Sequence, residues 1–279
     1  MHKIMAIFAH PDDEGAIGGT LAMYARRGAE VTLVCATRGE AGEISDPALA
    51  TPATLGAVRQ KELEDACAIL GIQPPIFLDY CDSGMAGTAE NGRPAAFIKA
   101  DPFEVLRKLV GVIRQHKPHI IITFEPFGWY GHPDHQAASR WATEAFTLAA
   151  DATAYPDQGA RWQAQGLFHA VLPFSTFRTV LEQAATSGAI ESSDILENIP
   201  EEQQLQTEAA VTHILDVTPL FDVKQNAMLV HRTQFSEEHM FRTIPRETII
   251  KAMGTEHFIQ IYPPPQPSLS PQSSLISSI

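Results

Sequence analysis

Short apolar runs alternate with amphipathic stretches along the first two thirds of the chain. Apolar runs bounded by Gly, Pro or charged residues predict buried strands, and stretches with a helical apolar period predict helices. The predicted strands cover residues 4–9, 30–36, 76–79, 119–124 and 167–172. The predicted helices cover residues 18–27, 56–70, 103–116 and 134–149.

This alternation predicts an α/β fold with a doubly wound, mostly parallel sheet. Right-handed crossovers between parallel strands would place helices on both faces of the sheet. In a strand order of 3-2-1-4-5, the first and fourth strands are neighbours at the topological switch point, outside whose carboxyl ends ligands bind. The loops after these two strands are therefore expected to meet.

The last third of the chain is less regular. Residues 211–217 predict a further strand, and Thr218 and Pro219 predict the start of a helix that runs to about Val230, so we expect a smaller C-terminal α/β extension. Residues 186–206 are polar without clear periodicity, and a lid over a pocket is one hypothesis for them. We expect a single domain over 1–262 and a disordered Pro- and Ser-rich tail over 263–279.

Composition narrows the class of protein. The net charge of −13, from 33 acidic and 20 basic residues without a basic run, disfavours nucleic acid as a partner. Three cysteines without CxxC spacing give no disulfide framework or thiolate zinc site, which favours a reducing cytoplasm. Neither a signal peptide nor a spanning apolar run is recognised, so we predict a cytoplasmic protein without membrane insertion.

The first motif with chemical content is the segment His10–Glu14 (HPDDE), which follows the first predicted strand. Three adjacent acids beside an imidazole repel one another when ionised, and a divalent cation would remove that cost. The plain alternative is that the acids favour the positive end of a helix. The glycines that follow run GxxGG rather than GxGxxG, so a dinucleotide site is weakly indicated, and close helix packing explains them better.

The second motif is the segment Tyr130–His135 (YGHPDH), which follows the fourth predicted strand. Its loop should meet the first motif at the switch point. Together the two segments supply a His/Asp/His set, which is the three-ligand arrangement of a catalytic zinc with an open fourth position.

The two motifs resemble the LmbE/PIG-L family of zinc-dependent de-N-acetylases, which includes deacetylases of mycothiol and bacillithiol biosynthesis and those that act on N-acetylglucosaminyl-phosphatidylinositol. The resemblance extends to Thr37–Gly42, Arg59–Glu62 and Lys224–Gln234. It implies a Rossmann-like fold, which agrees with the predicted elements.

The resemblance also implies roles for individual residues. His10, Asp13 and His135 would bind zinc, with ferrous iron as an alternative, and Asp12 would stay free as the general base. Tyr130 and His132 would stabilise the tetrahedral intermediate, with His132 protonated and Asp134 orienting and charging it. Arg59 resembles a substrate-contacting arginine. Glu40 in the matching segment after the second strand, and Asp82 at the carboxyl end of the third, complete the predicted substrate-binding residues.

The predicted function is therefore metal-dependent hydrolysis of an N-acetyl group on an N-acetylglucosaminyl-type small molecule. Zinc lowers the pKa of bound water to about 7, and Asp12 would take the proton as the water attacks the acyl carbon. Three alternatives stay open at this point: an amidase of a larger thiol or sugar conjugate, a silent metal- or sugar-binding module, and an iron oxygenase with a facial triad. The sequence also leaves open whether the chain forms a homo-oligomer.

Overall fold

The computed structural model describes residues 1–176, 178, 182, 186, 206–265 and 270–276. Its strands are β1 (Lys3–Phe8), β2 (Glu30–Thr37), β3 (Ile76–Tyr80), β4 (Ile120–Phe124), β5 (Gly166–Val171), β6 (His213–Asp216) and β7 (Thr255–Tyr262). The helices are α1 (Gly18–Arg26), α2 (Leu55–Leu70), α3 (Pro102–His116), α4 (Pro133–Ala150), α7 (Phe221–Leu229), α8 (Met240–Thr243) and α9 (Arg246–Met253). Short 3-10 helices are η1 (Asp13–Ile17), η2 (Ala89–Gly92), η3 (Phe97–Lys99), η4 (Pro156–Gln158) and η5 (Thr218–Leu220).

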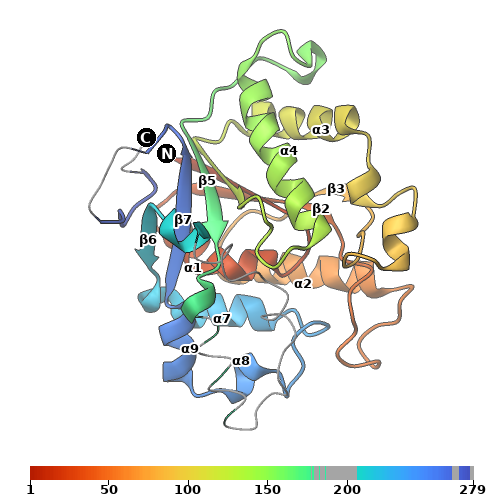
Figure 1. The fold of residues 1–279 in the computed structure, drawn as a ribbon, viewed down its shortest axis with the longest axis vertical. Helices are drawn as coiled ribbons and strands as arrows, with labels where there is room; N and C mark the ends of the chain where they lie inside the picture. Colours follow the sequence, from red (N-terminus) through yellow and green to blue (C-terminus); the bar gives the residue numbers. More distant parts are fainter. Residues whose placement is uncertain (177, 179–181, 183–185, 187–205, 266–269, 277–279) are drawn as a thin grey trace.

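The described strands form one sheet with the order β3-β2-β1-β4-β5-β7-β6. Strands β3 to β5 along this order are parallel, and β7 pairs antiparallel with both β5 and β6 (Figure 1). The predicted mostly parallel α/β sheet and its 3-2-1-4-5 order are confirmed. The C-terminal extension adds two strands to the edge of this same sheet.

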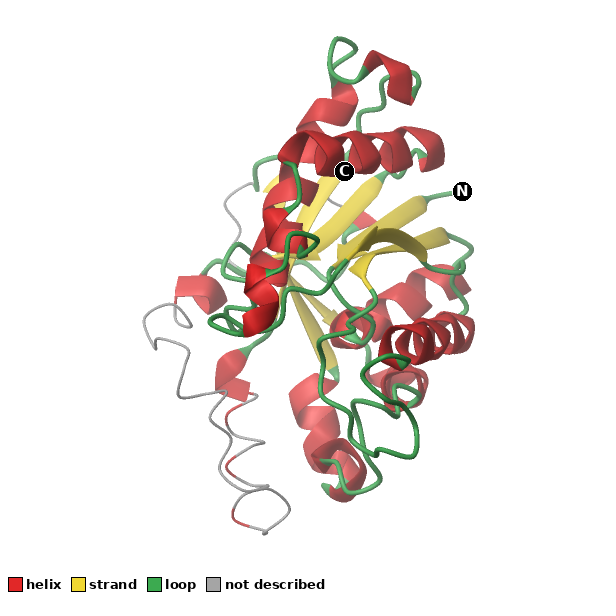
Figure 2. Ribbon diagram, turned by 90° about the vertical axis from the view of Figure 1, so that its right-hand side faces the viewer, coloured by secondary structure: helices red, strands yellow, loops and turns green. Residues whose placement is uncertain are grey.

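Helices cover both faces of the sheet. Helices α3 and α4 pack together on one face, and α1, α2 and α7 pack together on the other, as the two views show (Figures 1 and 2). Because β1 and β4 lie between these layers, residues 4–8 and 120–124 are almost fully buried. Continuous burial explains why these strands are uniformly apolar and do not alternate with polar residues.

Local signals set the helix ends near the predicted positions. Asp101 caps α3 by accepting a hydrogen bond from the Phe103 amide, and Pro102 occupies the first turn. Helix α2 ends at Gly71 in a left-handed conformation (φ 74°). The His132 side chain caps α4 by accepting a hydrogen bond from the Asp134 amide. The second sequence motif is therefore also the start of a helix, which holds it rigidly at the end of β4.

The glycine-rich stretch after the first motif serves close packing. A Cβ atom added at Gly19 would lie 2.5 Å from Cβ of Val217, the residue after β6. The start of α1 can thus approach the C-terminal extension only with glycine there, as the packing interpretation expected.

The sequence-based predictions for the C-terminal third of the chain fare differently at three places. Strand β7 was not predicted, because its buried positions include Glu256 and Gln260 and obscure the alternation. In the tail, Leu275 is buried and its amide donates to the Tyr24 hydroxyl on α1, and the Gln272 amide donates to the Thr212 carbonyl next to β6. Leu275 belongs to the hydrophobic core, although Pro and Ser dominate the composition of the tail. Residues 187–205, most of the proposed lid, lie outside the described residues.

Among the described residues, no helix combines the length and the apolar character that a membrane crossing would require.

Candidate metal centre and active site

The two sequence motifs meet at the carboxyl ends of the neighbouring strands β1 and β4. His10 Nδ1 lies 3.2 Å from His135 Nε2, and His135 Nε2 lies 3.1 Å from Asp13 Oδ1. Asp13 Oδ2 lies 3.7 Å from His10 Nδ1. We call His10, Asp13 and His135 the ligand group. All three side chains are buried.

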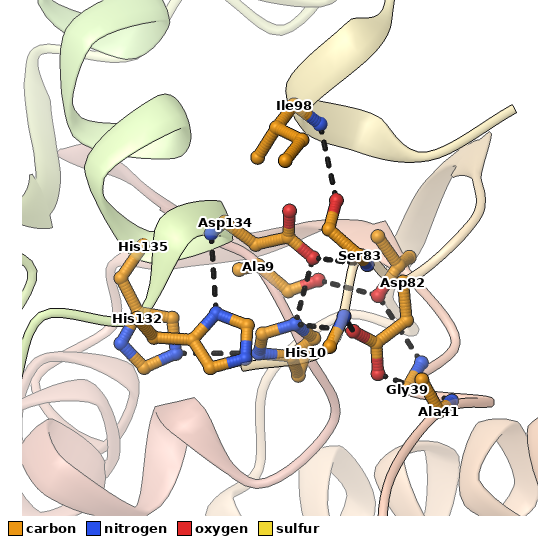
Figure 3. A network of polar contacts seen from close by, with 12 residues as sticks. Ala9, His10, Gly39, Ala41, Asp82, Ser83, Ile98, His132, Asp134 and His135 are labelled. Atoms are coloured by element: carbon orange, nitrogen blue, oxygen red, sulfur yellow. Dashed lines mark hydrogen bonds and ion pairs between the residues drawn. The ribbon is translucent and has the colours of Figure 1, made fainter. Parts of the chain in front are cut away.

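The far side of the His10 ring faces carboxylates. Its Nε2 lies 3.2 Å from Asp134 Oδ2 and 3.5 Å from Asp82 Oδ1 (Figure 3). Because an ionised carboxylate only accepts hydrogen bonds, Nε2 carries the hydrogen, and Nδ1 is left as a free lone pair in the neutral ring. Such a carboxylate–histidine pair is the usual way in which a metal-binding histidine is oriented.

His135 and Asp13 are oriented in the same sense. The Nδ1 of His135 lies 3.3 Å from the Gly128 carbonyl oxygen, so it donates there and leaves Nε2 free. Asp13 Oδ2 accepts hydrogen bonds from the Ala9 and His10 amides, which leaves Oδ1 directed at His135. Burial opposes ionisation of Asp13, but His135 and His10 outweigh it and lower its pKa to about 2.

This donor set fits a divalent cation. Two free nitrogen lone pairs 3.2 Å apart repel each other unless a cation or a proton lies between them. Nitrogen ligands bound tetrahedrally to zinc at about 2.0–2.1 Å lie about 3.3 Å apart. His10, His132 and His135 also have ligand atoms within 4.8 Å of one another, as do His10, Asp82 and Asp134. The site therefore offers imidazole and carboxylate donors for a metal.

Asp12 lies beside the ligand group and is held by Arg59. Arg59 Nη2 lies 3.0 Å from Asp12 Oδ2, and Nη1 donates to the Gly39 carbonyl at 2.8 Å. Gly39 makes room for this guanidinium, because a Cβ there would lie 2.1 Å from Nη1. About a quarter of the Asp12 side chain is exposed, but burial still raises its pKa to about 6, against the opposing effect of Arg59.

His132 is held as a neutral imidazole. Its Nδ1 accepts the Asp134 amide hydrogen at 3.1 Å, so the neutral ring carries its own hydrogen on Nε2. Burial and then the neighbouring His10 and His135 lower its pKa to about 3. The sequence-based expectation of a protonated His132, charged by the Asp134 carboxylate, differs from this geometry. The Asp134 backbone amide contacts His132, whereas its carboxylate contacts His10 and the Ser83 amide (Figure 3).

The remaining predicted residues surround this centre. The half-buried Tyr130 has its ring centroid 5.1 Å from that of His135, and burial, then Asp13 and Asp12, hold its pKa well above the ordinary value. Asp82 is buried behind His10 and accepts hydrogen bonds from the Gly84 and Ala41 amides. Glu40 is half-buried, and its Oε2 has no hydrogen-bond partner within the described part of the chain.

Sequence reasoning missed two contributions to the site. The Gly128 carbonyl fixes His135, and the Ser83 amide fixes Asp134. Backbone groups leave no side-chain signal in a sequence. In the structure Gly128 has a φ of 72°, so a glycine in this loop was the signal that could have indicated the turn. Glu14, which the first motif placed among the metal-facing acids, points away and contacts His231.

Comparison with known proteins identifies the family. The family described as GlcNAc-PI de-N-acetylase (PIG-L) matches residues 5–146, which include both motifs. The chain belongs to the PIG-L family. Among curated relatives of this PIG-L member, a 1D-myo-inositol 2-acetamido-2-deoxy-alpha-D-glucopyranoside deacetylase of Rhodococcus opacus is 37% identical over 246 residues, with 83% of this chain and 81% of the relative covered. A deacetylase of the same description from Catenulispora acidiphila is 34% identical, with 92% and 82% covered.

Solved structures agree on the fold. The N,N'-diacetylchitobiose deacetylase of Pyrococcus horikoshii aligns with a TM-score of 0.63 at 22% identity, over 93% of this chain and 83% of that one. The hydratase GalB of Pseudomonas putida aligns with a TM-score of 0.64 at 19% identity, over 97% and 100%. Because a hydratase shares this fold, the fold alone does not define the reaction.

The family and its curated relatives do define it. The chain is an N-deacetylase, and PIG-L deacetylases depend on a metal, for which His and Asp groups are available here. The predicted family and enzyme class are confirmed, and the iron-oxygenase alternative is set aside.

Proposed function

We propose that the protein hydrolyses the acetamide of an N-acetylglucosaminyl glycoside, with 1D-myo-inositol 2-acetamido-2-deoxy-alpha-D-glucopyranoside as the first substrate to test. The relatives of that description match more than four fifths of this chain and of their own length. The observation that carries the chemistry is the convergence of His10 Nδ1, Asp13 Oδ1 and His135 Nε2.

The ligand group would hold zinc, and His132 is the weaker choice for the third ligand. The neutral His132 ring uses its only lone pair to accept the Asp134 amide hydrogen, whereas Asp13 Oδ1 points at His135. Two imidazoles and one carboxylate suit zinc, and they also suit ferrous iron. When bound, the metal lowers the pKa of a water to about 7 and polarises the amide carbonyl.

Asp12 is the proposed general base. Its carboxylate lies next to the ligand group and takes a proton from the attacking water, while Arg59 holds Oδ2 and fixes the orientation of the carboxylate. The proton is then available for the leaving nitrogen. Arg59 is buried and engaged with Asp12, Pro11 and Gly39, so its proposed contribution to substrate binding acts through Asp12.

His132 and Tyr130 are the proposed hydrogen-bond donors to the developing oxyanion. His132 donates from Nε2 as a neutral ring, since the Asp134 amide occupies Nδ1. Tyr130 keeps its phenolic hydrogen because its pKa is raised. One donor of this kind typically contributes about 100- to 1000-fold in rate.

The three acidic residues predicted beside the reacting groups have different proposed roles. We propose that Asp134 and Asp82 orient His10 and strengthen it as a ligand, because both face its Nε2. Glu40 is the remaining candidate for substrate hydroxyl groups, because its half-buried carboxylate belongs to the loop that follows β2.

A direct assay tests the proposal. The zinc-loaded protein is incubated with N-acetylglucosaminyl compounds that differ in their aglycone, and release of primary amine is followed. Amine release that is lost on chelation and in Asp12→Ala supports the proposal. If zinc binds with a stoichiometry of one and every compound stays acetylated, the proposed substrate class is excluded.

A further inference from the structure

The backbone of Asp12 is held in a conformation that aspartate rarely adopts. Its φ of 103° and ψ of −22° place it in the left-handed region. Such a conformation is strained for a non-glycine residue and persists only where surrounding contacts enforce it. From this backbone conformation the Asp12 side chain reaches Arg59, whose Nη2 lies 3.0 Å from Oδ2.

Glu14 supplies one of the enforcing contacts. Its Oε2 accepts the Asp12 amide hydrogen at 3.0 Å, and the Gly15 amide in turn donates to the Asp12 carbonyl at 2.9 Å. Glu14 is fully buried, so its carboxylate cannot be solvated and must itself be held by a partner.

That partner is His231, from a segment 217 residues away in the chain. Its Nε2 lies 2.6 Å from Glu14 Oε1, and both side chains are fully buried. The other ring nitrogen, Nδ1, has no hydrogen-bond partner within the described part of the chain. The contact with Glu14 is thus the one that orients this ring.

The position of His231 is fixed from two sides. It follows the end of α7, where its amide donates to the Met228 carbonyl. Two residues later, the amide and hydroxyl of Thr233 donate to the two oxygens of Glu62 on α2, at 2.8 and 2.6 Å. The ring is therefore anchored to the scaffold before it contacts Glu14.

We propose that His231 and Glu14 form a positioning relay, in which the C-terminal part of the chain holds the catalytic base in place. His231 fixes Glu14, and Glu14 fixes the amide of Asp12 and with it the direction of the Asp12 carboxylate. Both are positioning residues, because the side-chain hydrogen bonds described for them join Glu14 to the Asp12 amide and His231 to Glu14, and none reaches the ligand group. The inference rests on the proposed function to the extent that Asp12 is the base.

The decisive variants are His231→Leu, which removes the donor at similar size, and His231→Gln, whose amide nitrogen can replace Nε2. We expect His231→Leu to lower kcat by roughly 100-fold, the cost of a misplaced reacting group, with unchanged KM and zinc content. His231→Gln should recover most of that loss. His169→Leu is the matched control, because it removes another buried histidine, which contacts Thr143 and lies outside the relay, and it should keep kcat near wild type.

A double variant separates a positioning role of His231 from a general effect on stability. In an Asp12→Ala background, His231→Leu should cause no additional loss beyond about twofold, because its target is already absent. If His231→Leu lowers kcat there by the same factor as in the wild type, the relay is refuted. Where His231→Leu does not fold, Glu14→Met and Glu14→Gln replace it, and only Glu14→Gln should retain activity.

Hydrogen exchange tests the relay without any substrate. The Asp12 amide should exchange about tenfold faster in His231→Leu than in the wild type, which corresponds to the loss of one ordinary hydrogen bond. Unchanged exchange would overturn the relay even if the enzyme is a deacetylase. Conversely, faster exchange together with no amine release from any N-acetylglucosaminyl compound would support the relay and refute only the proposed reaction.

Discussion

Two of the buried charged clusters in the described part of the chain differ in how completely their atoms are paired. The first is the ligand group with its neighbours. The second is the Lys224–Glu256 pair, which joins α7 to β7 with 2.7 Å between Nζ and Oε1, both side chains being at most 2% exposed. Lys224 Nζ also donates to the Ala16 and Met253 carbonyls, and Glu256 accepts the Gly19 and Thr20 amides.

The Lys224–Glu256 pair is saturated. Three acceptors meet the three ammonium hydrogens, and both carboxylate oxygens are bound. In the ligand group, by contrast, outer partners occupy one nitrogen of each histidine and leave the other two nitrogens facing each other. A saturated buried pair can only support the fold, whereas an unsaturated one is prepared to bind a cation. This difference, rather than burial or charge, separates the active site from a structural ion pair.

Removing a residue of the ligand group should have the largest effect on metal binding and on activity. In His135→Ala the ligand group loses its central donor, so we expect metal content and amine release to fall together, by more than the roughly 10- to 100-fold that loss of an outer partner costs. Metal analysis and the amine assay on the same sample check this. A His135→Ala protein that keeps one tightly bound zinc would assign the ligand to another residue.

Removing the proposed base should separate binding from chemistry. Asp12→Ala is expected to keep its zinc, because Asp12 is outside the ligand group, and to lose about 10²- to 10⁴-fold in kcat. Paired measurements of zinc content and turnover test it. Turnover close to wild type would exclude Asp12 as the base.

Removing one partner of the saturated pair should affect stability instead. Lys224→Met leaves Glu256 buried without its cation, which typically costs about 3–5 kcal/mol in the free energy of unfolding. Urea denaturation measures this, and zinc per folded molecule should not change. Lys3→Met, which breaks the partly exposed Lys3–Glu30 pair, is the control with an expected loss below about 1 kcal/mol. Equal losses in the two variants would contradict the comparison.

The smallest effect is expected for Asp82, which is either an orienting partner of His10 or a substrate-binding residue. As an outer partner of His10, Asp82→Asn should weaken zinc binding about 10- to 100-fold and leave KM unchanged. A raised KM at saturating zinc would instead restore the role in substrate binding that its place after β3 indicated. Asp79→Asn, at a largely exposed position one residue before the end of β3, serves as the control.

The sequence predicted most of the parallel sheet because its elements are encoded locally. The apolar runs of β1 and β4 can be recognised from their own residues and the residues that flank them. Strand β7 was missed because it buries Glu256, whose hydrogen-bond partners, the Gly19 and Thr20 amides, lie elsewhere in the chain. Polar residues on a buried face hide the period on which such predictions depend.

The same distinction between local sequence and tertiary packing applies to the candidate site. Two motifs at the ends of strands β1 and β4 were enough to predict that their loops would meet, since strand order in a doubly wound sheet brings those ends together. The family resemblance then selected His10, Asp13 and His135 within the two motifs. The direction of each side chain was decided only in the tertiary structure. Asp134 turns its carboxylate to His10 and not to its neighbour His132, and Glu14 leaves the other acids for His231. Hydrogen bonds between residues more than a hundred positions apart depend on packing, and no local pattern encodes them.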